Sequence, residues 1–413
     1  MLDRPLVGEY RWTTRVVVQL AVLAAAAYVY AVAELVPIGA MPAIAADLHV
    51  SEAHVGMLPA AYAFISVLAT VPLVRWTAHW PRRRAFVMTL VCLTVSQVFS
   101  ALAPGLGLLA ASRVLCALTH GLMWSIIATI GARLVPASHT GRATTALYIG
   151  TSAALIVGNP LTTSMSQAWG WRATTLVIAA AGAAITVLAQ CCLPVLATDA
   201  ARPETDSPGR WFRNARLVML CGITLVGVTA HFVSYTFVVP IIRDAAGLGD
   251  RGQAVVLAAY GVVGLVSMAL LAPATDSRPR LAATTTLAVL CLAFWVLVAG
   301  GPVGSGVTAI LVWGGCAAVL PPMLQASAIR ACPQHAEYAS ALYVTAFQIG
   351  IVSGSLLGGL VYGGHQILPV VATSAVLFAV ALVGTLLGGG VFRASSGPGL
   401  RQDRMDGTVA EQV

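Results

Sequence analysis

The segment ATDAARPETDSPGRWFRNAR, residues 197–216, is charged and lies between two long apolar regions of the chain. Apolar runs of about 20 residues, the length that a helix needs to cross a bilayer, occur on both sides of it. Six such runs precede the segment and six follow it. We therefore interpret residues 197–216 as a linker between a first half, residues 1–196, and a second half, residues 217–392. The polar tail 393–413 is expected to be disordered.

Composition supports a membrane location for both halves. Of the 413 residues, 58% are hydrophobic and only 9% are charged, and the mean hydropathy is +0.86. Soluble domains carry about 25% charged residues, so this chain cannot cover a surface exposed to water. We expect an all-α membrane protein with twelve spans near residues 15–41, 53–75, 84–103, 107–134, 142–165, 172–196, 217–242, 253–274, 281–300, 303–329, 338–361 and 367–392.

The Arg residues predict the orientation. All 23 basic residues are Arg, and they fall in short clusters between the apolar runs. If the N-terminus lies in the cytoplasm, the only Arg residues on the outer side are Arg172, Arg243 and Arg251, and Arg113 lies inside a span. The positive-inside rule therefore predicts that both termini are cytoplasmic. The net charge of +8 is not gathered in one patch, which argues against a nucleic-acid partner.

The two halves resemble each other in sequence. VRWTAHWPRR, starting at Val74, aligns with APATDSRPR, starting at Ala272, so that Ala78 corresponds to Asp276 and Arg82 to Arg280. The same offset of 198 places Glu34 within one residue of His231. Related halves of six spans each are typical of secondary transporters, whose substrate site lies near the midplane between the halves.

Glu34, in the stretch YAVAELVPIG, is the only acid well inside a predicted span. A charge at the bilayer centre costs roughly 2.5–3.5 kcal/mol on insertion scales, which favours a functional role. One interpretation is a site that takes up and releases a proton. The alternatives are an acid bonded to a neighbour for packing, or one that lies close enough to the outer interface to be solvated.

Two His residues also lie within spans, and each precedes an aromatic residue by four positions. His120 is followed by Trp124 and His231 by Tyr235, while Tyr30 precedes Glu34 by four. Residues four apart share a helix face, so three spans each present a titratable group beside an aromatic ring. Each His could instead form a hydrogen bond between helices. Three amides within spans have the same two interpretations, binding of a polar solute or a bond between helices: Asn159, Gln325 and Gln348.

Small residues in spans five and eleven predict close helix packing. The set includes Gly150 and Gly158, and Pro160 can kink its helix. The sequence contains no Walker loop, nucleophile elbow or H-E-x-x-H motif, so we expect no enzyme activity and no nucleotide site. The eight Cys residues indicate apolar packing rather than a metal site.

Four stretches together resemble the major facilitator superfamily, and within it the bacterial sugar efflux transporters related to the arabinose exporter. They are AELVPIGAMPAIAADLHVS, SRVLCALTHGLMWSI, GNPLTTSMSQAWGWRATTL and TAHFVSYTFVVPIIRDAAG. The resemblance implies a twelve-helix exporter of the bacterial inner membrane that is driven by proton exchange. Chloramphenicol-type drug exporters share much of the same pattern.

The chain departs from the superfamily at the loop between spans two and three. The family pattern G-x-x-x-D-R-x-G-R-[RK] is represented here by Val74, Ala78, His79, Pro81, Arg82 and Arg83, so its Gly and Asp are missing. Arg113 matches the Arg of the family's span-four motif, and the resemblance implies a role in proton coupling. Gly158 and Pro160 match part of the span-five signature of antiporters.

These observations predict a proton-coupled exporter of sugars or other small polar solutes, working by alternating access as a monomer, with the proton gradient in place of a cofactor. The alternative is a drug exporter on the same fold. An importer and a non-transporting sensor remain as further alternatives. The residues expected to act are, for proton coupling, Glu34, Arg113, His120 and His231; for solute binding, Tyr30, Tyr62, Trp124, Asn159, Tyr235, Gln325 and Gln348; and for gating and packing, Gly150, Gly158, Pro160, Arg82, Arg83, Asp276 and Arg280.

Overall fold

The computed structural model describes residues 12–196, 214–246, 250–362, 366–388 and 390–392, and every regular element in these ranges is helical. The first half contains α1 Thr14–Gly39, α2 Met41–Asp47, α3 Glu52–Trp76, α4 Arg82–Ala101, α5 Leu106–Arg133, α6 Thr140–Ala153, α7 Asn159–Trp169 and α8 Trp171–Cys192. The second half contains α9 Ala215–Tyr235, α10 Val238–Ala246, α11 Asp250–Ser277, α12 Pro279–Ala299, α13 Val303–Ala331, α14 Ala336–Val361 and α15 Ile367–Leu387.

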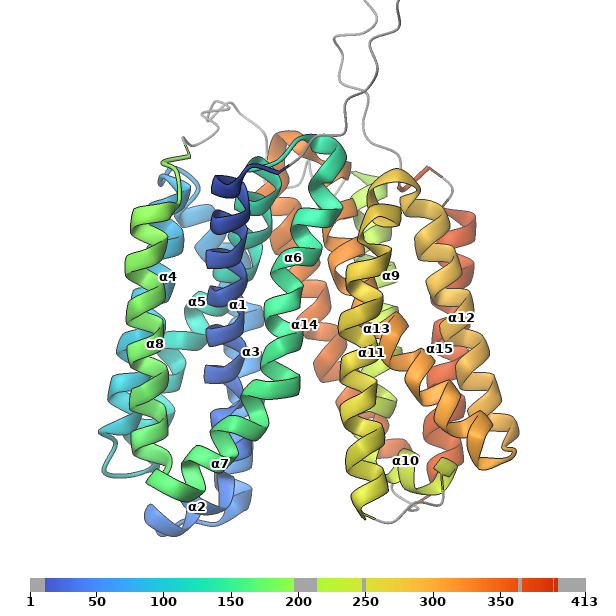
Figure 1. Ribbon diagram of the computed structural model, residues 1–413, viewed down its shortest axis with the longest axis horizontal. Coiled ribbons are helices and arrows are strands. Elements are labelled where there is room, and N and C mark those ends of the chain that lie inside the picture. Colours follow the sequence, from blue (N-terminus) through green and yellow to red (C-terminus); the bar gives the residue numbers. More distant parts are fainter. Residues whose placement is uncertain (1–11, 197–213, 247–249, 363–365, 389, 393–413) are drawn as a thin grey trace, which may run out of the picture.

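Each half has its own hydrophobic core. One cluster of buried side chains comes almost wholly from residues 20–193, and a second comes from residues 217–392. Figure 1 shows the blue-to-green helices on one side and the yellow-to-red helices on the other. Most of the predicted linker and the whole tail 393–413 lie outside the described residues, so those two boundaries stay predictions.

The halves meet along four pairs of helices that are related by the repeat. In the first half, α6 packs against α11 and α13 of the second half. Its counterpart in the second half, α14, packs in the same way against α3 and α5, which correspond to α11 and α13. The starts of α2, α3, α4, α5, α6 and α8 precede those of their counterparts in the second half by 196–198 residues, whereas α9 begins 201 residues after α1. The internal repeat read from sequence is therefore a repeat of structure.

The alignment of Arg82 with Arg280 is wrong by one residue. The counterpart helices α4 and α12 begin at Arg82 and Pro279, an offset of 197. Arg83 donates to the carbonyls of Gln190 and Leu193 at 3.3 Å, at the end of α8, and Arg280 donates to the carbonyl of Leu386 at 3.3 Å, at the end of α15. Arg83 is thus the structural counterpart of Arg280, which frees Arg82 for another contact.

Eleven helices in the described part of the chain are long and apolar enough to cross a membrane. Many of their large apolar side chains are exposed, for example Leu270 at 73% and Leu360 at 81%, as expected for surfaces solvated by lipid. The chain is a multi-pass membrane protein. The crossing count of twelve stays a prediction, because the predicted span 142–165 is not one continuous α-helix.

That predicted span is divided into α6, a π-helical turn Ala154–Gly158, and α7. Pro160 has no N–H to donate to the carbonyl four residues before it, so the regular ladder cannot pass this point unchanged. A π turn is one of the usual local solutions, and it bends the helix. The equivalent α14 has no Pro at this place and runs unbroken.

The described Arg residues mark one end of the bundle, at the top of Figure 1. We call it the Arg-rich end; it carries Arg75, Arg82, Arg83, Arg84, Arg133, Arg142, Arg278, Arg280 and Arg330, all at the ends or starts of helices. Arg172 and Arg243 lie at the opposite end.

Candidate functional site

Glu34 lies on α1 among residues from two other helices of the first half. Its Oε2 is 3.7 Å from Nδ1 of His120 on α5, and its side chain keeps 34% of its surface exposed. The hydroxyl of Tyr62, on α3, lies 2.9 Å from the same nitrogen. Glu34 is five residues from the end of α1, roughly 7–8 Å along the helix axis, so it sits towards the end opposite the Arg-rich one.

Arg113, on α5, binds the backbone of α1 rather than the Glu34 carboxylate. Its Nη1 donates to the carbonyl of Ala33 at 2.7 Å and its Nη2 to the carbonyl of Glu34 at 3.1 Å. The carbonyl of Ala33 would normally accept from the N–H of residue 37, but that residue is Pro37. The guanidinium therefore satisfies an acceptor that the proline leaves unpaired inside the membrane, where an unpaired carbonyl is costly.

The surroundings of Arg113 fix it in place. It is buried, and its guanidinium carbon lies 5.2 Å from the centroid of the Tyr62 ring, in cation–π geometry. Tyr62 thus contacts both Arg113 and His120. The predicted proton-coupling residues of the first half, Glu34, Arg113 and His120, form one cluster together with Tyr62.

Two of the aromatic residues predicted to stack on a solute are enclosed by protein in this conformation. Tyr30 is fully buried, and its hydroxyl lies 2.9 Å from that of Thr119. Tyr62 is also buried. Trp124 is only partly buried and lies between the rings of His120 and Tyr148, with centroids at 6.2 and 5.9 Å. Of these three rings, Trp124 is the one that faces both halves, since it packs against both cores.

His231 and Tyr235 form a second cluster, in the other half. Their rings stack with centroids 4.9 Å apart, and Nε1 of Trp313 donates to Nδ1 of His231 at 3.0 Å. The indole N–H can only donate, so Nδ1 of His231 must carry a lone pair, and the imidazole is neutral with its proton on Nε2. A protonated His231 would lose this bond, which argues against a proton-carrying role in this conformation.

The structure does not bring His231 and Glu34 into contact, although the repeat placed them at corresponding positions. Within the described residues, the ring partners of His231 are Phe232, Tyr235 and Trp313, all from its own half. The two clusters are therefore separate sites, one in each half.

The three predicted amides have different surroundings. Gln325 is completely buried and its Nε2 donates to the carbonyl of Trp124 at 3.0 Å and to the hydroxyl of Ser340 at 3.1 Å, so it ties α13 to α5 across the two halves. Gln348 is buried on α14. The side chains of Asn159 and Pro160 lie outside the described residues, so their predicted roles stay predictions.

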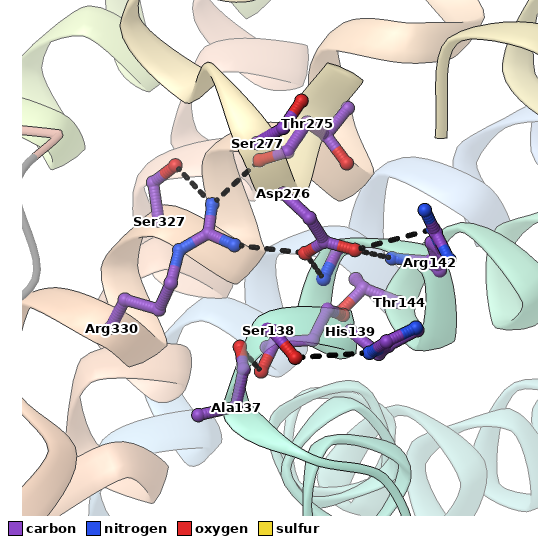
Figure 2. Close-up of polar contacts among 12 residues, drawn as sticks. Ala137, Ser138, His139, Arg142, Thr144, Thr275, Asp276, Ser277, Ser327 and Arg330 are labelled. Atoms are coloured by element: carbon purple, nitrogen blue, oxygen red, sulfur yellow. Dashed lines mark hydrogen bonds and ion pairs between the residues drawn. The ribbon is translucent and has the colours of Figure 1, made fainter. Parts of the chain in front are cut away.

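Asp276 links the halves at the Arg-rich end (Figure 2). Its Oδ1 accepts from the backbone N–H of Gly141 at 2.5 Å and its Oδ2 from that of Arg142 at 3.1 Å, at the start of α6. Nη1 of Arg330 donates to the same carboxylate at 3.2 Å. The carboxylate lies where the partial positive charge of a helix N-terminus favours an anion.

Arg82 makes the second link, with the charges reversed. Its Nε forms an ion pair with Glu337 in the first turn of α14, and its two terminal nitrogens donate to the carbonyls of Thr77 and Ala78. The first half lacks an acid at position 78, where the second half has Asp276. On this side of the pseudo-twofold axis the acid is Glu337 of α14 and the base is Arg82 at the start of α4. An ionic link between the halves is therefore present on both sides of the axis.

Two glycines allow α6 and the turn after it to approach α1 closely. A Cβ at Gly150 would clash with the backbone carbonyl oxygen of Ala24, and one at Gly158 would clash with the side chain of Val32. The packing role predicted for both glycines agrees with these contacts.

Three residues of these sites escaped sequence reasoning: Trp313, Tyr260 and Glu337. The ring of Tyr260 lies 5.4 Å from that of Trp313, and its buried hydroxyl has no hydrogen-bond partner in the described part of the chain. Glu337 could have been found as an acid at the Arg-rich end of the predicted span 338–361. No pattern of spacing identifies Trp313, because its partner comes from another helix.

Comparison with known proteins identifies the family. The model of the Major Facilitator Superfamily matches residues 22–355. The "Chloramphenicol efflux pump Rv0191" of Mycobacterium tuberculosis strain H37Rv is 50% identical over 382 residues, covering 90% of this chain and 92% of that protein. The "Chloramphenicol efflux pump MT0201" of strain CDC 1551 matches to the same extent.

Solved structures agree on the fold. The transporter FucP in its outward conformation superposes with a TM-score of 0.76 over 91% of this chain and 99% of that one, at 14% identity. The human organic anion transporter MFSD10 gives a TM-score of 0.69 over 93% of this chain and 100% of that one, at 15% identity. The names of the sequence relatives support the drug-exporter alternative better than the sugar exporter that we placed first.

Proposed function

The chain belongs to the Major Facilitator Superfamily, and on this premise we propose that it exports chloramphenicol or chemically similar amphipathic drugs in exchange for protons. The observation that carries the proposal is 50% identity, over nearly the whole of both chains, to a protein named as a chloramphenicol efflux pump. We place it in the inner membrane of a bacterium as a monomer, with the Arg-rich end and both termini in the cytoplasm.

The proton site that we propose is Glu34. Its carboxylate is partly exposed, lies towards the end opposite the Arg-rich one, and is close to His120. In this conformation a proton would reach it from outside. Protonation removes the charge beside His120, which lowers the electrostatic cost of enclosing the site as the molecule closes on that side.

Arg113 would act through position rather than by carrying a proton. Its bonds to the carbonyls of Ala33 and Glu34 hold the part of α1 that carries the acid. Tyr62, which contacts both Arg113 and His120, connects the proton site to the aromatic lining.

The drug would bind between the two clusters. Trp124 and Tyr235 supply aromatic faces, and His231 and Gln348 supply hydrogen-bonding groups. Tyr30, Tyr62 and Gln325 are engaged by protein in the present conformation, so we assign them to the lining only when the halves move.

Alternating access would break and remake the two links at the Arg-rich end. The Asp276 network and the Arg82–Glu337 pair join the halves there, and Gln325 joins them at the level of Trp124. These contacts support an assignment of this conformation as closed towards the cytoplasm. Release of the proton on that side requires both links to open.

The experiment that tests the substrate class is drug accumulation in cells. Cells that express the chain should accumulate several-fold less labelled chloramphenicol than cells with an empty vector and should grow at higher drug concentrations, while labelled arabinose should accumulate equally in both. Reduced arabinose with unchanged chloramphenicol would overturn the proposal in favour of sugar export.

A further inference from the structure

A hollow at the start of α12 lies outside the transport site. It has a volume of about 570 Å³ and is lined by Arg278, Arg280, Leu281, Thr284, Leu386 and Phe392. Sites for small ligands commonly enclose roughly 300–1,000 Å³, so the hollow is large enough for the head of an amphipathic molecule. α12 and α15 lie at the edge of the bundle in Figure 1, away from the helices that join the halves.

The rim of the hollow is positive, and no acid is among the described residues that line it. Arg278 and Arg280 are both exposed, and the first turn of α12 contains no acidic residue. The residue before the helix, Arg278, gives no side-chain cap. Pro279 has no N–H and the N–H of Ala282 donates to the carbonyl of Arg278, so the backbone N–H groups of Arg280 and Leu281 are left for another acceptor. Two guanidinium groups and an uncapped helix start together favour an anion at this place.

The floor of the hollow is apolar and open to the membrane. The side chains of Leu281 and Leu386 are 53% and 49% exposed, and Phe392 is buried beside them. A free inorganic anion would leave this surface uncovered, whereas a molecule with a hydrocarbon tail would cover it. The hollow lies at the Arg-rich end, where we expect the headgroups of one leaflet to meet the ends of the helices.

We propose that this hollow binds an anionic phospholipid. The phosphate lies against Arg278, Arg280 and the start of α12, and an acyl chain runs over Leu281 and Leu386.

The start of α9 shows the contrasting case. Arg216 is also exposed near the first turn of a helix at the same end, but Oδ1 of Asn214 already accepts from the backbone N–H groups of Arg216 and Leu217. That helix start needs no external anion, and Arg216 does not line the hollow. It therefore supplies a control for the loss of positive charge alone.

The test is native mass spectrometry of the full-length protein in detergent, titrated with phosphatidylglycerol or phosphatidylcholine. The wild type should bind phosphatidylglycerol more tightly. The double variant R278Q/R280Q should bind it about 25-fold more weakly, since each Arg near a membrane surface contributes about fivefold. The double variant R75Q/R216Q, with the same loss of charge outside the hollow, should stay within about twofold of the wild type.

Three results would overturn the proposal. One is equal affinity of the wild type and R278Q/R280Q for phosphatidylglycerol, with equal thermal-unfolding midpoints showing that both are folded. Another is full displacement of the lipid by millimolar inorganic phosphate, which would make the hollow a simple anion site. Equal binding of phosphatidylcholine would likewise contradict it.

Discussion

At the scale of single residues, the most informative feature is the relation between Pro37 and Arg113. The proline removes a backbone donor from α1, and the guanidinium on α5 supplies donors to the carbonyls of Ala33 and Glu34. Arg113, for which the family resemblance implies a role in proton coupling, thus also has a structural role in α1.

This relation predicts a specific pattern of stability. Arg113→Gln should lower the free energy of unfolding by about 2 kcal/mol, the usual cost of losing hydrogen bonds to a charged group. In a Pro37→Ala background, residue 37 can again donate to the carbonyl of Ala33, so the same substitution should cost clearly less. Thermal unfolding of the four purified proteins in detergent measures the difference, and an equal loss in both backgrounds would refute the relation.

His231 gives a second prediction at this scale. The amide oxygen of Gln can replace the acceptor for Trp313, so a pH gradient should accelerate transport by His231→Gln by the same factor as in the wild type, whatever the change in drug affinity. His231→Leu leaves the indole N–H unpaired and should cost about 1–3 kcal/mol of stability. If transport by His231→Gln no longer responds to a pH gradient in vesicles, the neutral-acceptor interpretation is wrong.

Single residues show where sequence reasoning succeeds and where it stops. Glu34, Arg113 and His120 stand out because polar groups are rare inside spans, and the structure gathers them into one cluster. Trp313 could not be predicted as a site residue, because aromatic residues are common within spans and only the structure shows that its N–H donates to His231. Glu34 and His231 occupy corresponding positions in the two halves, and such positions need not touch.

At the scale of elements, α6 and the π turn after it fit closely against α1. Gly150 lies against the backbone carbonyl of Ala24, while Gly158 lies against a methyl group of Val32, and a side-chain methyl can shift more readily than the backbone of a packed helix. The two positions should therefore differ in their tolerance of a methyl group.

Gly150→Ala should destabilise the protein by about 1–3 kcal/mol or more, the range for overpacking of a tight interface. Gly158→Ala should cost less, and Gly222→Ala on α9, where a Cβ would meet nothing within 4 Å, should be almost neutral. Melting midpoints in one detergent give the ranking. A Gly150→Ala variant as stable as Gly222→Ala would contradict the packing described here.

The links at the Arg-rich end give a prediction about conformation. Asp276→Asn removes the charge from a carboxylate that accepts from two backbone N–H groups and from Arg330. Loss of such charge-assisted bonds, at about 1.5–3 kcal/mol, should shift the balance between closed and open forms by about 10- to 100-fold. Distances between spin labels at the starts of α6 and α12 should lengthen in the variant. An unchanged distance distribution would mean that the network does not hold the halves together.

The long helices could be predicted from sequence because hydropathy marks them directly. Pro160 indicates a kink but not the π turn, since the same proline is compatible with several local solutions. The repeat in sequence differs by one residue from the repeat in structure at Arg82, because a one-residue slip in a loop leaves no trace in the apolar pattern on either side. That slip hid the Arg82–Glu337 pair.

At the scale of the whole molecule, two related halves with separate cores are joined mainly through four pairs of helices. Rigid halves with a polar, ionic junction at one end can rock against each other without disturbing either core. Neither the conformation nor the substrate could be predicted from sequence patterns, because both depend on contacts between the halves. The 50% identity to a protein named as a chloramphenicol efflux pump supports the substrate class that we propose, and the links at the Arg-rich end support the conformation that we assign.

The central claim is that Glu34 couples proton movement to drug movement. The direct measurement is chloramphenicol flux in proteoliposomes with and without an imposed pH gradient, comparing the wild type with Glu34→Gln and with Asp244→Asn, an exposed acid at the same end of the molecule. The wild type and Asp244→Asn should be accelerated several-fold by the gradient, while Glu34→Gln should still exchange drug at equilibrium but show no acceleration. If Glu34→Gln responds to the gradient as strongly as the wild type, Glu34 is not the coupling site.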